Sequence, residues 1–361
     1  MRVLICGGGA IGASCAYFLA RRGIEAVVIE RTGVACAASG KSGGFLALDW
    51  CDGTPLQALA RRSFALHASL PGEIGADWGH RPLDTFGGFG SARKGASAER
   101  RGGPGWLSER VTIDRRLGSA ATTAQVHPRL FTEGVMRAAE ALGASLRIGE
   151  VQNLVNGRGH ARAAGVVVDG EVIAGDAIVI ALGPWSALAA RWLPLPRVFG
   201  LKGHSLVFET GDRVPAEALF LEFEEAAGPV SSPEVFPRPD GTTYVCAISS
   251  DSPVPLDPAD VAPDPGASER LEAICRSLSP ALARAKIVTR QACFRPVTRD
   301  GLPLIGRIPG SANAYAATGH SVWGILNAPA TGEAIAELIA DGAAKSLDLT
   351  PFDPGRPAEG R

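Results

Sequence analysis

The first thirty residues contain three glycines in the spacing G-x-G-x-x-G, set between an apolar stretch and an alanine-rich stretch. These glycines are Gly7, Gly9 and Gly12. Residues 2–6 before them have the apolar, β-branched composition of a buried strand, and residues 13–22 after them have that of a helix, which Gly23 would end. A second apolar stretch follows and ends in an acid, Glu30. This order predicts a strand–helix–strand unit whose turn is built by glycine.

Each part of this unit suits a bound dinucleotide. Gly7 permits the tight turn, Gly9 allows a pyrophosphate to approach the backbone, and Gly12 allows the helix to pack on the sheet. The helix N-terminus offers free N–H groups to phosphates. Glu30 can accept both hydroxyls of a ribose and would repel a 2′-phosphate, which disfavours NADP. A strand–helix–strand unit without a nucleotide is the alternative.

The same N-terminal segment has features of a signal peptide or a membrane span. Residues 3–20 carry no charge and follow Arg2. The glycines gather in the first half of this run, where they would weaken a spanning helix.

The seven cysteines include no C-x-x-C pair and lie mostly in apolar runs. We therefore expect no membrane span, no disulfide framework and a cytoplasmic location.

Composition excludes other classes of function. Lys plus Arg number 36 and Asp plus Glu number 37, which gives a formal charge of −1 and argues against a broadly basic nucleic-acid-binding protein. The six histidines show no metal-ligand spacing, so no metal is expected. A length of 361 residues is sufficient for two domains.

Three further segments narrow the choice of dinucleotide. Residues 31–44 form a loop of small residues that could wrap a diphosphate with hydroxyls and backbone N–H groups. An apolar strand at 177–181 is followed by L-G-P-W-S at 182–186. Near the C-terminus, R-P-V-T-R-D-G-L-P-L-I-G at 295–306 leads into T-G-H-S-V-W-G-I at 318–325.

Together these segments resemble the FAD-dependent oxidoreductases of the D-amino-acid oxidase superfamily, nearest to glycine oxidase, monomeric sarcosine oxidase and the D-amino-acid dehydrogenases. Leu182 stands where the family usually has Thr. The likeness is strong over about 1–45, 120–190 and 290–342, whereas 190–290 is divergent.

The resemblance implies an α/β FAD-binding domain of Rossmann type, glutathione-reductase-like, and an α+β substrate domain built on an antiparallel sheet. The implied division is 1–80, 122–195 and 294–345 for the discontinuous FAD-binding domain, 81–121 and 196–293 for the substrate-binding domain, and 346–361 for a C-terminal tail.

The local patterns add expected elements, taken in chain order. These are helix 55–70, strands 82–89 and 111–113, a helix from His127 to Leu142, a strand from Val151, strands 199–208 and 218–223, a hairpin at 235–245 with an Asp-Gly turn, a loop or lid at 251–267, helix 269–278, and a last helix starting near Ala328.

Twenty-one positions match the family's FAD contacts. They are Gly7, Gly9, Ala10, Ile11, Gly12, Glu30, Arg31, Ser39, Ser42, Gly43, Gly44, Val151, Gly183, Trp185, Gly319, His320, Ser321, Val322, Trp323, Gly324 and Ile325. In the family, the segment matching 319–325 places its backbone and a helix N-terminus at the N1/C2=O edge of the flavin, where reduced flavin is negatively charged. For His320, a satisfied core histidine is the alternative.

The resemblance also implies a reaction, in which the C–N bond of an amino acid or secondary amine is oxidised by hydride transfer to flavin N5. The product is an imine that water hydrolyses. Arg295 matches the residue that holds the substrate carboxylate, and an ordinary structural arginine is the alternative. Tyr244 is the other candidate at the substrate, with core packing as its alternative.

Cys293 stands in the register of the cysteine that carries flavin covalently in monomeric sarcosine oxidase. However, Phe294-Arg295-Pro296 follows the non-covalent pattern of glycine oxidase, so we expect non-covalent FAD.

Other functions stay open at this stage. The electron acceptor could be O₂, or a quinone or protein carrier as in a dehydrogenase. The chain could also be a flavin-carrying assembly or regulatory protein without turnover. An NAD dehydrogenase is a further alternative, against which the block from Arg295 to Gly324 argues. The expected partners are a small-molecule amino acid or amine and an electron acceptor, and the sequence does not give an oligomeric state.

Overall fold

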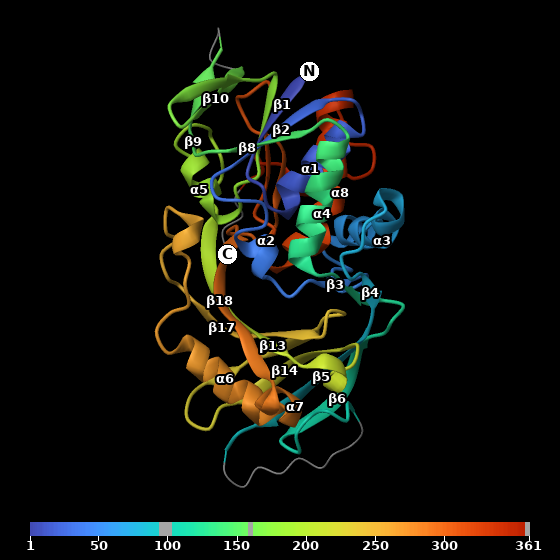
Figure 1. The fold of residues 1–361 in the computed structure, drawn as a ribbon. Helices are drawn as coiled ribbons and strands as arrows, with labels where there is room; N and C mark the ends of the chain where they lie inside the picture. Colours follow the sequence, from blue (N-terminus) through green and yellow to red (C-terminus); the bar gives the residue numbers. More distant parts are fainter. Residues whose placement is uncertain (94–102, 158–161, 358–361) are drawn as a thin grey trace.

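The computed structural model describes residues 1–93, 103–157 and 162–357, and its ribbon shows two layered units, one above the other (Figure 1). The upper unit is built on a six-stranded sheet of order β19-β20-β12-β1-β2-β8, parallel except for the β19–β20 pair. Its strands are β1 (Arg2–Cys6), β2 (Glu25–Glu30), β8 (Ser145–Ile148), β12 (Ala177–Ile180), β19 (Leu304–Arg307) and β20 (Ala314–Thr318). The central strands are continuous apolar runs because both faces of the sheet are covered.

Four helices lie together in the upper unit (Figure 1). They are α1 (Ala10–Ala20), α3 (Gln57–Ile74), α4 (Pro128–Ala141) and α8 (Gly324–Asp341). Their apolar side chains form one buried core with those of β1 and β12, including Val3, Phe131 and Val179. A second core on the other face contains Leu4 and Ile180 and receives a three-stranded sheet, whose strands are β9 (Val151–Asn156), β10 (Ala163–Val168) and β11 (Glu171–Ala174).

The lower unit is an eight-stranded, largely antiparallel sheet (Figure 1). Its order is β18-β13-β17-β16-β14-β5-β6, with β15 paired to β14. The strands are β5 (Asp84–Ser91), β6 (Val111–Gly118), β13 (Phe199–Glu209), β14 (Glu217–Glu224), β15 (Val230–Ser231), β16 (Glu234–Pro237), β17 (Thr242–Ser250) and β18 (Lys286–Val297). Helices α6 (Ala267–Leu278) and α7 (Pro280–Arg284) cover one face through a core around Leu206 and Leu271. The other face is therefore directed toward the upper unit.

Short elements join the two units. A small sheet has the order β3-β7-β4. The elements are α2 (Ala38–Lys41), β3 (Phe45–Ala47), β4 (Arg81–Pro82), β7 (Thr123–Gln125) and α5 (Ser186–Ala189), with 3₁₀ turns η1 (Gly183–Trp185), η2 (Gly211–Arg213), η3 (Pro258–Asp260), η4 (Ser321–Trp323) and η5 (Thr350–Phe352).

The predicted fold class is confirmed, with a nucleotide-binding-type parallel sheet and an antiparallel sheet. The expected domain boundary at 294 falls inside β18, which pairs with β13 from Lys286 to Val297, and the division into domains stays a prediction. The expected segment 81–121 includes 94–102, and the expected tail 346–361 includes 358–361; both of these stretches lie outside the described residues.

The start of the last helix differs from expectation, because α8 begins at Gly324 and not near Ala328. Pro329 therefore lies inside the helix, where it has no N–H to donate to the carbonyl of Ile325. His67 of α3 supplies the missing donor, with its Nε2 2.9 Å from that carbonyl oxygen. Burial lowers the pKa of His67 to about 4, so the ring is neutral and Nε2 carries its proton toward Ile325. A tertiary contact thus repairs the break that proline would cause.

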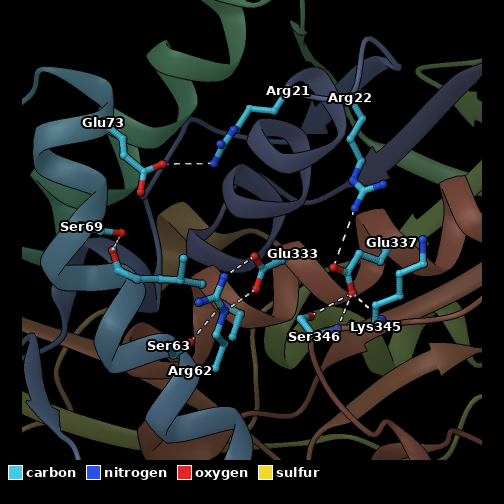
Figure 2. A network of polar contacts seen from close by, with 12 residues as sticks. Arg21, Arg22, Arg62, Ser63, Ser69, Glu73, Glu333, Glu337, Lys345 and Ser346 are labelled. Carbon is cyan, nitrogen blue, oxygen red and sulfur yellow. Dashed lines mark hydrogen bonds and ion pairs between the residues drawn. The ribbon is translucent and has the colours of Figure 1, made fainter.

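Ion pairs also fasten the helices α1, α3 and α8 to one another (Figure 2). Arg62 of α3 makes a two-pronged contact with Glu333 of α8, at 2.8 and 2.6 Å. Arg21 at the end of α1 pairs with Glu73 of α3 at 3.2 Å. Glu337 accepts hydrogen bonds from the backbone N–H groups of Lys345 and Ser346, which fixes the chain after α8. These contacts hold the middle and C-terminal part of α8 against α3 and the chain that follows it.

Candidate active site

A single large cavity lies between the glycine turn after β1 and the free face of the antiparallel sheet. Its volume, including solvent at its mouth, is about 2040 Å³. Residues from both units line it. Every predicted site residue except Gly12 lies on its wall.

The turn after β1 depends on two glycines. Gly7 has a φ of +113°, and a Cβ there would stand 2.4 Å from the carbonyl oxygen of Ala181. A Cβ on Gly12 would stand only 1.9 Å from the carbonyl oxygen of Gly7. Gly12 therefore acts by allowing α1 to approach the turn, and does not itself line the cavity. The N-terminus of α1 opens at Gly9, beside the hydroxyl of Ser39, which accepts a hydrogen bond from the N–H of Ala10 at 2.8 Å.

Glu30 at the end of β2 turns its carboxylate toward this same turn. Its two oxygens accept hydrogen bonds from the N–H groups of Gly8 at 2.7 Å and Thr32 at 3.0 Å. A carboxylate has about four acceptor positions, so acceptor capacity is left for ligand hydroxyls. Arg31 also reaches the wall, but its guanidinium pairs with Glu150 at 3.1 Å and donates to the carbonyl of Leu256 at 3.1 Å.

Replacing Glu30 by alanine should weaken FAD retention. A hydrogen bond to a charged group contributes about 1.5–3 kcal/mol, so the dissociation constant of FAD should rise by about ten- to hundredfold. Fluorescence titration of the apoprotein with FAD measures this. Glu25→Ala is a matched control, because Glu25 lies at the other end of the same strand and pairs with exposed Arg2. Equal FAD affinities of the Glu30 and Glu25 variants would remove Glu30 from the cofactor site.

The loop after α2 contributes a hydroxyl that lacks a partner. The Oγ of Ser42 is buried and has no hydrogen-bond partner within the described part of the chain. It faces the cavity beside Gly43 and Gly44. A buried polar atom without a partner costs free energy, so a ligand or water acceptor is expected here. Val151, Gly183 and Trp185 line other parts of the wall.

The C-terminal segment brings a helix N-terminus to the cavity. Gly319 and Ser321 have φ values of +81° and +50°, so the backbone makes a sharp turn before η4 and α8. Val322, Trp323, Gly324 and Ile325 complete this wall. The positive end of the α8 dipole therefore faces the cavity, where it would favour a negative charge.

His320 in this segment has a structural role. Its side chain is buried, and Nε2 lies 3.0 Å from the hydroxyl of Thr331 in α8. Burial lowers its pKa to about 3, so the ring is neutral. A neutral histidine hydrogen-bonded to α8 supports the turn, while its buried Nδ1 has no partner within the described residues, so a ligand contact at His320 stays a prediction.

Arg295 lies on the free face of the antiparallel sheet, across the cavity from the glycine turn. Its guanidinium passes over Gly203 of β13, where an added Cβ would meet Nη2 at 3.3 Å, and donates to the hydroxyl of Ser249 in β17 at 3.4 Å. That single long hydrogen bond leaves most of the guanidinium donors available. Arg295 is partly buried and lines the cavity. The arrangement suits a two-pronged contact with a planar anion.

Tyr244 and Cys293 flank this position. Burial raises the pKa of Tyr244 well above its ordinary value, so the hydroxyl stays protonated, and its ring stacks on Phe236 with 6.0 Å between centroids. Burial likewise raises the pKa of Cys293. A thiol with a raised pKa is a poor nucleophile, which agrees with the expectation that it carries no covalent group.

Several wall residues were not predicted from the sequence. Four aromatic side chains contact one another, with centroid separations of 4.8–5.4 Å, and they are Phe45, Trp50, Phe220 and Phe236. The acid Glu234 lies next to them on β16. Alternation along 234–237 places Glu234 and Phe236 on one face of the strand, and this was the available signal.

The segment 251–267 is a loop, as predicted, apart from the 3₁₀ turn η3, and Leu256 and Pro258 from it line the cavity. Asp264 anchors it through Lys202 at 2.5 Å and through hydroxyls of Ser250 and Ser252, and these contacts hold the pKa of Asp264 well below its usual range. Trp185 of the upper unit donates to the carbonyl of Pro255 at 2.7 Å. The loop therefore bridges the two units.

Among residues 1–93, 103–157 and 162–357, no group of three or more His, Cys, Asp or Glu side chains could hold a metal ion. In the same part of the chain, every helix is too short or too polar to cross a bilayer.

A glycine turn and a helix N-terminus on one side of the cavity, with an arginine on the facing sheet, suit a dinucleotide bound beside an anionic ligand. The chain belongs to the FAD dependent oxidoreductase family, DAO, whose family model matches residues 2–338. The glycine oxidase of Geobacillus kaustophilus superposes with a TM-score of 0.80 at 25% identity, covering 99% of both chains. The iminodiacetate oxidase of Chelativorans sp. BNC1 superposes with a TM-score of 0.78 at 21% identity, over 98% of this chain and 99% of the other.

Among curated proteins, the relatives carry general names. The Schizosaccharomyces pombe protein C1F5.03c, named as an oxidoreductase, is 29% identical over 98% of this chain and 97% of its own length. TDA3 of Saccharomyces cerevisiae, also named as an oxidoreductase, is 32% identical over 69% of this chain, which corresponds to 54% of its own length. The family and its FAD dependence are therefore shown, and the substrate is not given by these names.

Proposed function

We propose that this protein oxidises the C–N bond of an amino acid or secondary amine, using non-covalently bound FAD. The observation that carries the proposal is the position of Arg295, whose guanidinium faces the same cavity as the glycine turn. A rigid guanidinium fork matches a carboxylate, which is the group that amino acids share. The names of glycine oxidase and iminodiacetate oxidase agree with substrates that carry both an amine and a carboxylate.

The residues present fit FAD. The unpartnered hydroxyl of Ser42, the N-terminus of α1 and the glycine turn suit a diphosphate, and Glu30 suits a ribose. The segment Gly319–Ile325 would hold the flavin ring with the N-terminus of α8. When bound, FAD supplies the acceptor for the hydride that leaves the substrate carbon.

The remaining steps depend on residues of the chain. Arg295 binds and orients the carboxylate, so that the substrate is held in one position along the sheet face. The four aromatic side chains Phe45, Trp50, Phe220 and Phe236 keep water away from this part of the cavity, and this strengthens the contact between Arg295 and its anion. The positive end of α8 would favour negative charge on a flavin ring held at this wall. The imine product is then hydrolysed by water after it leaves this wall.

An anaerobic reduction screen tests this proposal. The purified protein should be yellow with one FAD per chain, and one of D- or L-amino acids, glycine or sarcosine should bleach the flavin without oxygen. Readmitting O₂, or adding a quinone instead, identifies the acceptor. Protein that binds NAD and not FAD, or a flavin that none of these compounds reduces, would contradict the proposal; the second result would favour a flavin-carrying protein without turnover.

Acid precipitation tests the mode of FAD attachment. Because burial keeps Cys293 protonated, the yellow colour should stay in the supernatant when the protein is precipitated with acid. A yellow pellet that becomes colourless in a Cys293→Ser variant would show covalent attachment at Cys293. We also propose a cytoplasmic location, supported by the seven cysteines, all of which are free thiols.

A further inference from the structure

Glu234 lines the same cavity as Arg295, and its carboxyl group has few hydrogen-bond partners. In the described residues, its only hydrogen bond comes from the thiol of Cys246, at 3.5 Å from Oε2. A thiol is a weak donor, and an ionised carboxylate has about four acceptor positions. Burial raises the pKa of Glu234, which reflects the cost of keeping this charge away from water. A buried carboxyl group with one weak partner has unused hydrogen-bonding capacity, and a cationic ligand would favour its ionised form.

The sheet register places Glu234 close to Arg295 without direct contact. Strand β16 lies next to β17, where Glu234 pairs with Cys246. The Arg295 guanidinium reaches Ser249 of the same β17 by crossing over Gly203. Arg295 acts electrostatically on Glu234 and opposes the rise of its pKa, yet within the described residues the side chain of Glu234 contacts Cys246 and that of Arg295 contacts Ser249, and no ion pair joins the two. Opposite charges that face one cavity and stay apart suit a ligand that itself carries both charges.

The wall around Glu234 adds a second attraction for a cation. Phe220 pairs in register with Glu234, and its ring meets Trp50 with 4.8 Å between centroids. Aromatic faces attract cationic nitrogen, and more strongly where water is excluded. The other acids on the cavity wall, Glu30 and Glu150, are committed to the turn after β1 and to Arg31. Glu234 is thus the acid available at the Arg295 end within the described residues.

We propose that Glu234 binds a cationic nitrogen of the substrate while Arg295 binds its carboxylate, so that the site selects zwitterionic amino acids over simple carboxylic acids. This inference rests on the proposed function and specifies its substrate class. The nitrogen is either the α-ammonium group or an ammonium group at the end of a side chain. Both have the same chemistry, and matched ligands distinguish them.

Ligand binding to the FAD-loaded protein gives the test, because it needs no turnover. Propionate carries only the carboxylate, and D- or L-alanine adds the α-ammonium group. Dissociation constants come from ligand-induced shifts in melting temperature and from changes in the absorbance of the oxidised flavin, recorded without oxygen. In Glu234→Gln, alanine should bind about ten- to hundredfold more weakly, as expected for loss of a charge-assisted hydrogen bond, whereas propionate should bind equally or more tightly. Glu234→Asp keeps the charge and should retain part of the alanine affinity.

Glu222→Gln is the matched control, since Glu222 is an exposed acid on the neighbouring strand β14 and lies outside the cavity lining. This variant should leave the dissociation constants of both alanine and propionate unchanged. Lysine and norleucine show which nitrogen Glu234 binds, because norleucine lacks the side-chain ammonium group. If Glu234→Gln lowers the affinity for both equally, the α-ammonium group is assigned. If it lowers the affinity for lysine alone, the side-chain ammonium group is assigned.

Unchanged affinities of both alanine and lysine, relative to propionate, in Glu234→Gln would overturn the inference, as would equal losses in Glu234→Gln and Glu222→Gln. Failure of the proposed function gives a different result. In that case the ratio still falls in Glu234→Gln, but no amino compound that binds reduces the flavin. Wild-type protein that binds propionate and no amino acid would overturn both.

Discussion

Replacing Arg295 by methionine is expected to lower kcat/KM by about thirty- to several-thousand-fold on a carboxylate substrate. Removing one partner of a buried charge pair costs about 2–5 kcal/mol, because the other charge is left in a partly desolvated site. The guanidinium has only one long hydrogen bond within the described residues, to Ser249, so most of its donors would be committed to the substrate. If the carboxylate contact also aligns the reacting C–H bond, kcat falls as well as kcat/KM.

Steady-state kinetics on the substrate found by the anaerobic screen measures this effect. Arg295→Lys keeps the charge but loses the fork, so it should recover only part of the rate. Arg299→Met is a matched control, because Arg299 follows the same strand and is exposed. FAD content should be the same in all three variants. A fully FAD-loaded Arg295→Met protein with near-normal kcat/KM would end the assignment of Arg295 to the carboxylate.

Replacing Gly12 by alanine is expected to destabilise the fold by about 3 kcal/mol and to lower FAD affinity more than tenfold. Overpacking a well-packed site typically costs about 1–3 kcal/mol, and here the added Cβ meets a backbone carbonyl oxygen at 1.9 Å. That carbonyl belongs to Gly7, so it cannot move without distorting the turn that would hold the diphosphate. Urea unfolding of the apoprotein and titration with FAD measure the two effects separately.

Gly72→Ala is the control, because it makes the same change inside another helix, α3, where an added Cβ meets nothing within 4 Å. It should stabilise the protein by about 0.5–1 kcal/mol through helix propensity. If Gly12→Ala were as stable as Gly72→Ala, the close approach of α1 to the turn would not matter to the fold.

The sequence predicted the nucleotide-binding half well because its signals are local. The turn around Gly7, the acid at Glu30 and the block beginning at Arg295 each depend on backbone geometry within a few residues. Such features leave a pattern of glycines and fixed spacings that can be recognised in one sequence.

The start of α8 could not be predicted in the same way. Proline is favoured in the first turn of a helix, so Pro329 indicated a start near Ala328. The helix extends four residues further because His67, more than 250 residues earlier in the chain, donates to the carbonyl of Ile325 that Pro329 leaves unpaired. A contact across that distance leaves no local signal.

Glu234 escaped prediction for a related reason. Its neighbours in sequence, Pro233 and Val235, belong to an ordinary strand, and acids are common on exposed strand faces. Only the assembled sheet shows that this face is turned toward the upper unit and shares a cavity with Arg295. Charge in a binding site is therefore harder to predict from one sequence than the backbone turns that support it.

The order of strands in the parallel sheet has a consequence for synthesis on the ribosome. β1 lies beside β12, β12 lies beside β20, and α8 shares a buried core with α1, so the cofactor-binding unit combines the first and last segments of the chain. At about 5–20 residues per second, roughly 15–60 s pass between translation of Glu30 and translation of Asp341. During this interval the apolar β1 and α1 have been made but lack two of their neighbours. Nascent chains therefore expose this surface to chaperones, and FAD can stabilise the native state only after translation is nearly complete.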